Sequence, residues 1–204
     1  MVPIGSQRRS VIGAVLALTI GITASATSGA RAADPLVARL EVAATALRPA
    51  LRLAQSGSIN FPINPLPRCE MNTSSFGQPR SGGRTHEGLD IMANKGQEIY
   101  AVGNGKLIKQ TVDGATDATL SGNSWKLQLP DGTYYFYAHL SAFADGLKVN
   151  DSVVLGQLIG YVGDTGNPGA GNYHLHFEVH PKGGAAVDPF PMLTIPKSCR
   201  IYTA

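Results

Sequence analysis

The stretch "NYHLHFEVHP" at residues 172–181 decides the fold class, because apolar and polar residues alternate along it. Such alternation is typical of a β-strand with one apolar and one polar face. A strand with a solvated outer face is one interpretation. However, solvated faces more often carry Lys, Thr or Ser, whereas imidazoles two positions apart favour a metal or acid–base site. The apolar face comprises Tyr173, Leu175, Phe177 and Val179, and the polar face comprises His174, His176, Glu178 and His180.

Short apolar segments separated by Gly, Asp and Asn continue through most of the chain after Cys69. We expect pairs of strands in "QEIYAVGNGKLIKQTV" (97–112), "WKLQLPDGTYYFYAHL" (125–140) and "DSVVLGQLIGYVGDTG" (151–166). Turn signals at this spacing predict an all-β domain at residues 61–204. Its antiparallel sheets would form an open sandwich or barrel with a substrate groove.

Residues 1–32 read as a signal peptide. Arg8 and Arg9 precede the apolar run 11–24, and "ARA" at 30–32 has the form of a cleavage site. The apolar run is short for a membrane span, so an uncleaved anchor is the lesser alternative. We therefore expect an exported protein, in the periplasm, in the medium or at the cell wall, with no stable membrane insertion after cleavage.

Residues 33–60 are expected to form a helix and a linker. Asp34 suits the helix N-cap and Pro35 the first turn, while Pro49 should kink or end the helix. Leucines and an alanine recur on one helical face. We expect this helix to pack on the domain or on a partner that the sequence does not identify; a lid over the groove is the alternative.

The charge balance argues against nucleic acid as a partner. The formal net charge is +3, and the leader contributes Arg8, Arg9 and Arg31 without any acidic residue. The mature chain is then formally neutral and has no basic run, whereas nucleic-acid binding depends on neutralising phosphates.

The chain has two cysteines, Cys69 and Cys199, which bracket most of the patterned sequence. In an exported protein an even number of cysteines indicates a disulfide. A cysteine-based metal site is the alternative, but the paired C-x-x-C spacing is missing.

The other histidines offer partners for the strand at 172–181. His86 lies in "THEGLD" with Asp90 four positions on, a separation that brings both side chains to one side of a strand or a helix. One more histidine would complete a three-ligand set for Zn²⁺ with an open coordination position. His139 lies in the segment "YAHL" (137–140).

Taken together, the segments "HEGLD", "YAVGNGKL", "YYFYAHL", "LGQLIGYVGDTGNPGAGNYHLHFEVH" and "AVDP" resemble the lysostaphin/LytM-type (LasA-like) zinc endopeptidases, which cleave peptides of cell-wall peptidoglycan. The resemblance covers roughly residues 86–189. It implies that one Zn²⁺ is held by His86, Asp90 and His176, and that His139 and His174 are catalytic.

Two residues of the strand at 172–181 lie outside that set. Glu178 shares its polar face and would orient a ligand imidazole, although a solvated or structural carboxylate is the equal alternative. His180, at the end of the strand before Pro181, is expected to be a bystander.

The resemblance implies an exported endopeptidase that hydrolyses peptidoglycan peptides with a zinc-activated water. The alternative is a non-catalytic wall-binding or amidase-regulating module of the same fold. Degenerate modules of that kind would be expected to lack a ligand or a catalytic histidine, whereas all five positions are filled here. A zinc carrier is disfavoured, because the chain has no flexible histidine-rich tract.

Overall fold

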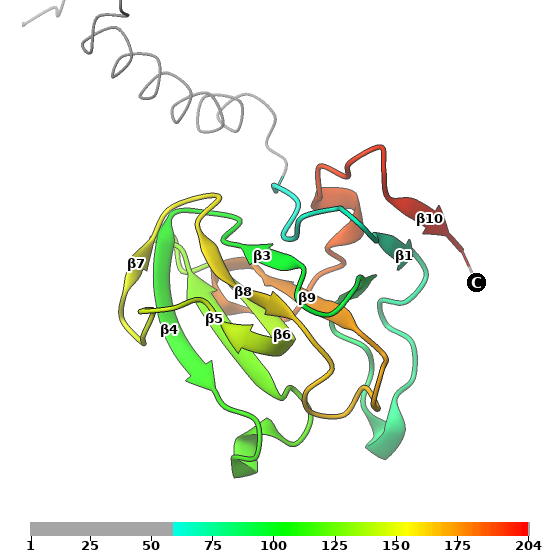
Figure 1. The fold of residues 1–204 in the computed structure, drawn as a ribbon, viewed down its shortest axis with the longest axis horizontal. Coiled ribbons are helices and arrows are strands. Elements are labelled where there is room, and N and C mark those ends of the chain that lie inside the picture. The colour runs from blue at the N-terminus through cyan, green and yellow to red at the C-terminus, as the bar shows by residue number, and fades with distance from the viewer. Residues whose placement is uncertain (1–58, 204) are drawn as a thin grey trace, which may run out of the picture. The chain divides into compact units, whose positions relative to one another are not determined.

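The computed structural model describes residues 59–203, which form an all-β domain without α-helices (Figure 1). The signal peptide predicted at 1–32 and the helix predicted from Asp34 lie outside the described residues. The strands are β1 (Glu70–Asn72), β2 (Leu89–Met92), β3 (Glu98–Tyr100), β4 (Gly105–Thr111), β5 (Asn123–Gln128), β6 (Tyr134–Phe143), β7 (Ser152–Val153), β8 (Leu158–Val162), β9 (His174–His180) and β10 (Arg200–Tyr202). Short 3₁₀ turns are η1 (Ser81–Gly83), η2 (Thr116–Ala118), η3 (Pro181–Gly183) and η4 (Phe190–Met192).

The strands form one hydrogen-bonded network in the order β10-β1-β2-β9-β6-β5-β4-β7, and the β3–β8 pair branches from β6. Neighbouring strands are antiparallel except β1 and β10, which pair in parallel. The expectation of purely antiparallel sheets is therefore wrong at this edge. The C-terminal strand returns beside the first strand after a long connection, so no hairpin turn constrains its direction.

Strand β6 connects the two parts of the network because it changes partner along its length. Residues 134–138 pair with β9, whereas residues 140–143 pair with β8. The change occurs at His139, whose backbone adopts a positive φ of 66°. The β3–β8 pair then packs over the main sheet, and the indole Nε1 of the fully buried Trp125 donates a hydrogen bond to the Ile159 carbonyl of β8.

Only one of the three predicted strand pairs is a hairpin. Segment 125–140 forms the β5–β6 hairpin, which is confirmed. In segment 97–112, β3 pairs with β8 while β4 pairs with β5 and β7, so its two strands do not pair with each other. In segment 151–166, β7 and β8 are likewise separated. In both cases the chain crosses between the two parts of the network, which local spacing does not reveal.

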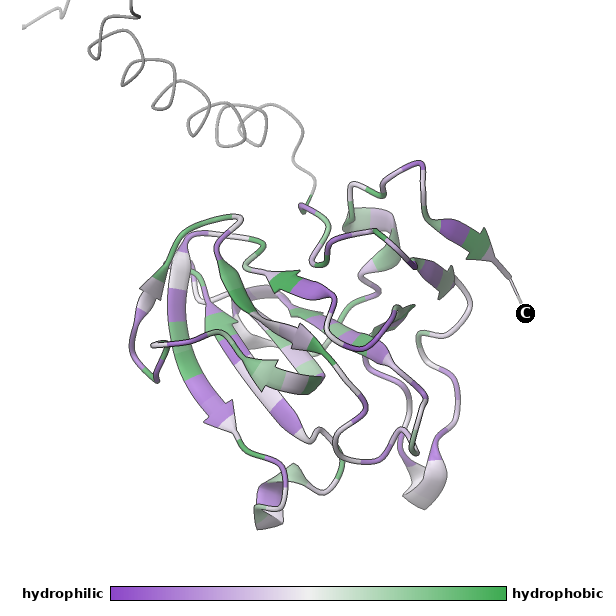
Figure 2. Cartoon of the chain, in the orientation of Figure 1, coloured by the Kyte–Doolittle hydropathy of each residue, from purple (hydrophilic) through white to green (hydrophobic). Residues whose placement is uncertain are grey.

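Strand β9 lies at the centre of the order, and its apolar face enters the core. Leu175, Phe177 and Val179 are at most 1% exposed, as the alternation predicts. Along β4, by contrast, hydrophobic and hydrophilic residues follow one another in short blocks and do not alternate singly (Figure 2). The opposite face of β9 is largely shielded from solvent, since His174 and His180 are buried and His176 and Glu178 are partly buried. The interpretation of that face as a wet outer surface is therefore wrong.

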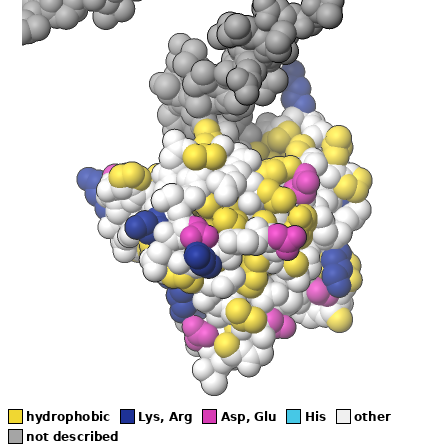
Figure 3. Space-filling view, turned by 60° about the vertical axis from the view of Figure 1, so that its left-hand side comes forward, with side chains coloured by type: hydrophobic (Ala, Val, Ile, Leu, Met, Phe, Trp, Pro, Cys, Tyr) yellow, Lys and Arg dark blue, Asp and Glu magenta, His cyan; other side chains and the backbone are white. Residues whose placement is uncertain are grey.

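Positive and negative side chains are interspersed on the face shown in Figure 3. Nothing on that face resembles the continuous basic surface that binds nucleic acid. Within residues 59–203, no helix is long and apolar enough to cross a membrane.

A disulfide joins Cys69, just before β1, to Cys199, just before β10, as the sequence predicts. The two cysteines are 130 residues apart, so the bond closes a loop that includes nearly the whole domain. The chain-entropy model assigns about 5 kcal/mol of stability to a loop of this length.

Reduction of this bond should lower the melting temperature by about 10 °C, because the unfolded chain regains the entropy that the cross-link removes. Differential scanning calorimetry with and without reductant measures the shift. A Cys69→Ser/Cys199→Ser variant should melt at the lower temperature, and the reductant should not change its melting temperature. Equal melting temperatures for the oxidised and reduced protein would contradict this account.

Candidate active site

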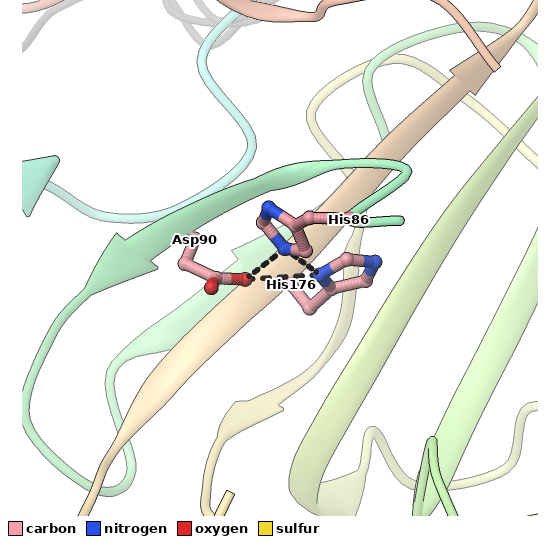
Figure 4. A group of neighbouring side chains, drawn as sticks. All are labelled: His86, Asp90 and His176. Atoms are coloured by element: carbon pink, nitrogen blue, oxygen red, sulfur yellow. Dashed lines mark hydrogen bonds and ion pairs between the residues drawn. The ribbon is translucent and has the colours of Figure 1, made fainter. Parts of the chain in front are cut away.

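Three side chains with ligand-type atoms converge beside β9: those of His86, Asp90 and His176 (Figure 4). His86 Nε2 lies 3.0 Å from Asp90 Oδ1 and 3.0 Å from His176 Nδ1, and the latter two atoms are 2.9 Å apart. Asp90 and His176 meet because β2 and β9 pair antiparallel with these two residues directly opposite each other.

His86 reaches the group from the loop before β2, not from the same strand as Asp90. The chain bends at Gly88, between the two residues. A Cβ atom at Gly88 would lie 2.6 Å from the Phe177 carbonyl oxygen and 2.8 Å from His176 Cε1, so only glycine allows this close approach. The sequence spacing is compatible with a strand or a helix, but in the structure this bend brings the two side chains together.

The outer hydrogen bonds of the two imidazoles determine which ring nitrogens face Asp90. His86 Nδ1 lies 2.9 Å from the Ser75 carbonyl oxygen, which can only accept, so Nδ1 carries the proton. His176 Nε2 donates in the same way to Glu178 Oε1 at 2.9 Å. In their neutral forms, His86 Nε2 and His176 Nδ1 therefore direct lone pairs at a carboxylate oxygen. Three acceptors this close together require a cation between them.

This donor set fits a zinc ion. Two imidazole nitrogens and one carboxylate oxygen are ligands that zinc accepts, and ligands in such sites lie about 2.0–2.2 Å from the metal. Because the three ligand atoms are about 3 Å from one another, a single metal ion can lie at that distance from all three. Glu178 holds the outer nitrogen of His176, an arrangement that fixes the tautomer and orientation of metal-binding histidines.

Without a metal, a proton takes the place of the cation. Burial alone would lower the pKa of His176, but hydrogen bonds to Asp90 and Glu178 outweigh it and raise the pKa to about 9. Burial alone would raise the pKa of Asp90, but hydrogen bonds to His176 and His86 hold it well below its usual range. At neutral pH the metal-free site therefore retains one proton, which a metal must displace.

Zinc affinity should consequently weaken as the pH falls. Below the raised pKa of His176, about 9, each metal bound releases one proton, so the dissociation constant should increase by about tenfold per pH unit. Competition titrations against a chelator of known affinity between pH 8 and pH 6 measure this slope. A dissociation constant that stays flat across this range would show that no proton is displaced.

His139 and His174 line the same pocket and present the same chemistry to it. His139 Nδ1 donates to the Thr165 carbonyl oxygen and His174 Nδ1 to the Asn172 carbonyl oxygen, each at 2.9 Å. Burial, reinforced by neighbouring imidazoles, lowers the pKa of His139 to about 3; burial also lowers the pKa of His174. Both rings are therefore neutral at pH 7, and each Nε2 is left as a proton acceptor.

The geometry distinguishes the two histidines of the H-x-H pair. His176 Nδ1 lies within 3.0 Å of both other ligand atoms, whereas His174 Nε2 lies 3.6 Å from Asp90 Oδ1. The rings of His139 and His174 lie side by side, with centroids 4.8 Å apart. The pocket thus contains a three-atom ligand group and, beside it, a pair of neutral imidazoles.

His180 contacts Glu178 directly and is not the bystander that we expect from the sequence. Its Nε2 lies 2.7 Å from Glu178 Oε2 and its Nδ1 lies 2.9 Å from the Gly184 carbonyl oxygen. Burial alone would raise the pKa of Glu178, but hydrogen bonds from His176 and His180 outweigh it and lower the pKa. The i, i+2 spacing on one strand face was the available signal for this contact.

Comparison with known proteins identifies the family. The model of peptidase family M23 matches residues 84–189, close to the range of the resemblance. The L-Ala–D-Glu endopeptidase of Bacillus subtilis is 35% identical over an alignment of 136 positions that covers 59% of this chain and 38% of that protein. The glycyl-glycine endopeptidase ALE-1 of Staphylococcus capitis is 36% identical over 115 residues, 54% of this chain and 30% of that protein. The chain thus spans well under half the length of these relatives.

Solved structures agree with the sequence comparison. A zinc-containing peptidase from Vibrio cholerae superposes with a TM-score of 0.53 at 27% identity, covering 65% of this chain and 39% of that chain. A variant of the catalytic domain of the prophage-encoded M23 protein EnpA from Enterococcus faecalis gives 0.50 at 26% identity, covering 63% and 94%. Because the family model spans more than half of the 204 residues and contains all the side chains of the pocket's ligand group, the chain belongs to peptidase family M23.

Proposed function

We propose that this protein is an exported zinc endopeptidase that hydrolyses peptide bonds of bacterial peptidoglycan. The observation that carries the proposal is the convergence of three lone pairs, from His86, Asp90 and His176, beside two neutral imidazoles in one open pocket. Related endopeptidases are named for L-Ala–D-Glu and glycyl-glycine bonds, both of which occur in cell-wall peptides.

One Zn²⁺ held by these three residues would supply Lewis-acid chemistry, which polarises a carbonyl and makes water a stronger acid. Three protein ligands leave one coordination position for water or substrate, as in catalytic zinc sites. Asp90, His86 and His176 would hold the ion beside the pocket. Glu178 keeps His176 in the tautomer that can bind the metal.

His139 and His174 are proposed to carry the proton transfers. Each presents an unprotonated Nε2, because its Nδ1 is engaged with a backbone carbonyl. One of them takes the proton of the attacking water and delivers it to the leaving amine. Once protonated, a ring donates through Nε2 and stabilises the charge that develops on the carbonyl oxygen. The two histidines are equivalent in this respect, so no order is assigned to them.

A non-catalytic wall-binding or amidase-regulating module is the second candidate. A module of that kind needs neither a complete ligand set nor a proton acceptor. Here the ligand group and both imidazoles are present in one pocket, an arrangement that favours the enzyme.

Export is part of the proposal. The predicted signal peptide supports it, as does the disulfide between Cys69 and Cys199, because such bonds persist in oxidising compartments.

The enzyme is tested by the release of soluble peptides from purified peptidoglycan, with mass analysis of the products. Hydrolysis should occur with zinc, stop with a chelator and return when zinc is added back. The mature chain and a chain beginning at Phe61 should both be assayed, because the helix predicted from Asp34 is a candidate lid. If neither form cleaves any wall type while fully loaded with zinc, the regulatory module is the better account.

Replacement Glu178→Gln should weaken zinc binding by about 10- to 100-fold, because His176 loses the charged acceptor that orients it. Chelator competition measures the affinity. Glu70→Gln on β1, whose carboxylate pairs with Arg68 away from the pocket, is the matched control and should bind zinc normally. Unchanged affinity in Glu178→Gln would assign Glu178 a purely structural role.

A further inference from the structure

Two arginines stand at the rim of the pocket, on a hairpin that leads directly into His86. Pro79 and Thr85 form an antiparallel bridge, and the Arg80 amide donates to the Arg84 carbonyl oxygen at 2.8 Å. Turn η1 (Ser81–Gly83) forms the tip of this hairpin. Arg80 and Arg84 are therefore directly opposite each other, and both line the pocket.

The position of Arg84 relative to His86 directs its side chain towards the same side. The two residues are separated by Thr85 in an extended segment, and side chains two positions apart in such a segment share a face. Arg80, as the cross-strand neighbour of Arg84, shares that face too. Nη2 of the Arg80 guanidinium lies 3.2 Å from Asp90 Oδ2, so the Arg80 side chain lies beside the ligand group.

Only one of the two arginine charges at this rim is paired with an acidic side chain. Like charges directly opposite each other destabilise a hairpin. Asp90 pairs with Arg80, but no acidic side chain within residues 59–203 pairs with Arg84. Two arginines and three carboxylates line the pocket, and the proton retained on His176 brings the formal charge of the metal-free lining to zero. A divalent cation that displaces this proton changes the charge to +1. With metal bound, the pocket attracts an anion.

We propose that Arg84, assisted by Arg80, is a subsite for a free carboxylate of the substrate, close to the bond that is cut. A guanidinium forms paired, charge-assisted hydrogen bonds with a carboxylate. This inference rests on the function proposed above and narrows it. The substrate is an acidic stem peptide, whose carboxylate comes from D-glutamate or from the C-terminus, and not an uncharged glycine bridge.

The test compares matched peptides on the zinc-loaded full-length protein. Cross-linked stem peptides are prepared with all carboxylates free, with the D-glutamate carboxylate amidated, or with the C-terminal carboxylate amidated. In the wild type, one of the two amidations should lower kcat/KM by about 10- to 100-fold, which identifies the source of the carboxylate. Arg84→Gln should lower kcat/KM for the free peptide by a similar factor and abolish the effect of that amidation.

Arg200→Gln, an exposed arginine on β10, is the control and should behave as wild type. Calorimetric binding of the same peptides is measured in parallel, so that the subsite is tested even if nothing is hydrolysed. Loss of hydrolysis with retained, carboxylate-dependent binding would overturn the proposed function but not the subsite. Equal handling of free and amidated peptides by the wild type, or equal losses for both in Arg84→Gln, would overturn the subsite.

Discussion

Replacing His176 with alanine should abolish both zinc binding and peptide hydrolysis. His176 Nδ1 lies 3.0 Å from His86 Nε2 and 2.9 Å from Asp90 Oδ1, so its loss reduces three ligand atoms to two. The same result is expected for His86→Ala and Asp90→Ala. Elemental analysis of the purified proteins should find close to one zinc per chain in the wild type and almost none in these variants.

The neighbouring histidine provides the matched control. His174 lies on the same strand, two residues away, and is also buried, but its Nε2 is 3.6 Å from Asp90 Oδ1. His174→Ala should therefore retain zinc while losing hydrolysis. If His174→Ala loses the metal and His176→Ala keeps it, the roles of the pair are reversed.

Replacing His139 should leave zinc bound and remove most of the hydrolysis. Its ring belongs to the pocket but not to the ligand group, and its Nδ1 is engaged with Thr165. Loss of a proton acceptor or of an oxyanion partner commonly lowers the rate by about 10²- to 10⁴-fold. Zinc content, together with kcat on purified peptidoglycan, separates this result from the loss of a ligand.

The choice of variant matters at this position because His139 has a φ of 66°. Alanine is strained at positive φ, whereas asparagine tolerates it, so His139→Asn should be measured beside His139→Ala. Both should lose hydrolysis, and His139→Asn should melt close to the wild type. An active His139→Asn protein would mean that the loss in His139→Ala reflects backbone strain and not proton transfer.

The local sequence pattern predicts strand β9, which contributes apolar side chains to the core and polar side chains to the site. Alternation along residues 172–181 places Leu175, Phe177 and Val179 in the core and His176 on the opposite face of the strand, whereas its pairing with Asp90 depends on the register between β2 and β9. The β5–β6 hairpin follows equally from its turn residues. Contacts between distant segments do not follow from local pattern: the exchange of partners along β6 at His139 depends on where β8 and β9 arrive, which no turn signal encodes.

Within the site, the sequence indicates the residues with characteristic chemistry, Glu178 among them, but it gives no signal for supports that come from the backbone. Histidines are rare in this chain, so their clustering is informative. By contrast, Ser75 and Thr165 orient His86 and His139 through backbone carbonyls, which any residue type can supply. Arg80 and Arg84 are ordinary surface residues in the sequence, and only the hairpin places them at the pocket.

The central claim is that one metal ion lies between His86, Asp90 and His176, with His139 and His174 beside it but unbound. Anomalous diffraction at the zinc edge, from crystals of the protein loaded with one equivalent of zinc, locates the ion directly. The account predicts a single peak about 2.0–2.2 Å from His86 Nε2, Asp90 Oδ1 and His176 Nδ1. A peak coordinated by His174 or His139 in place of His176, or no ordered peak in this pocket, would contradict it.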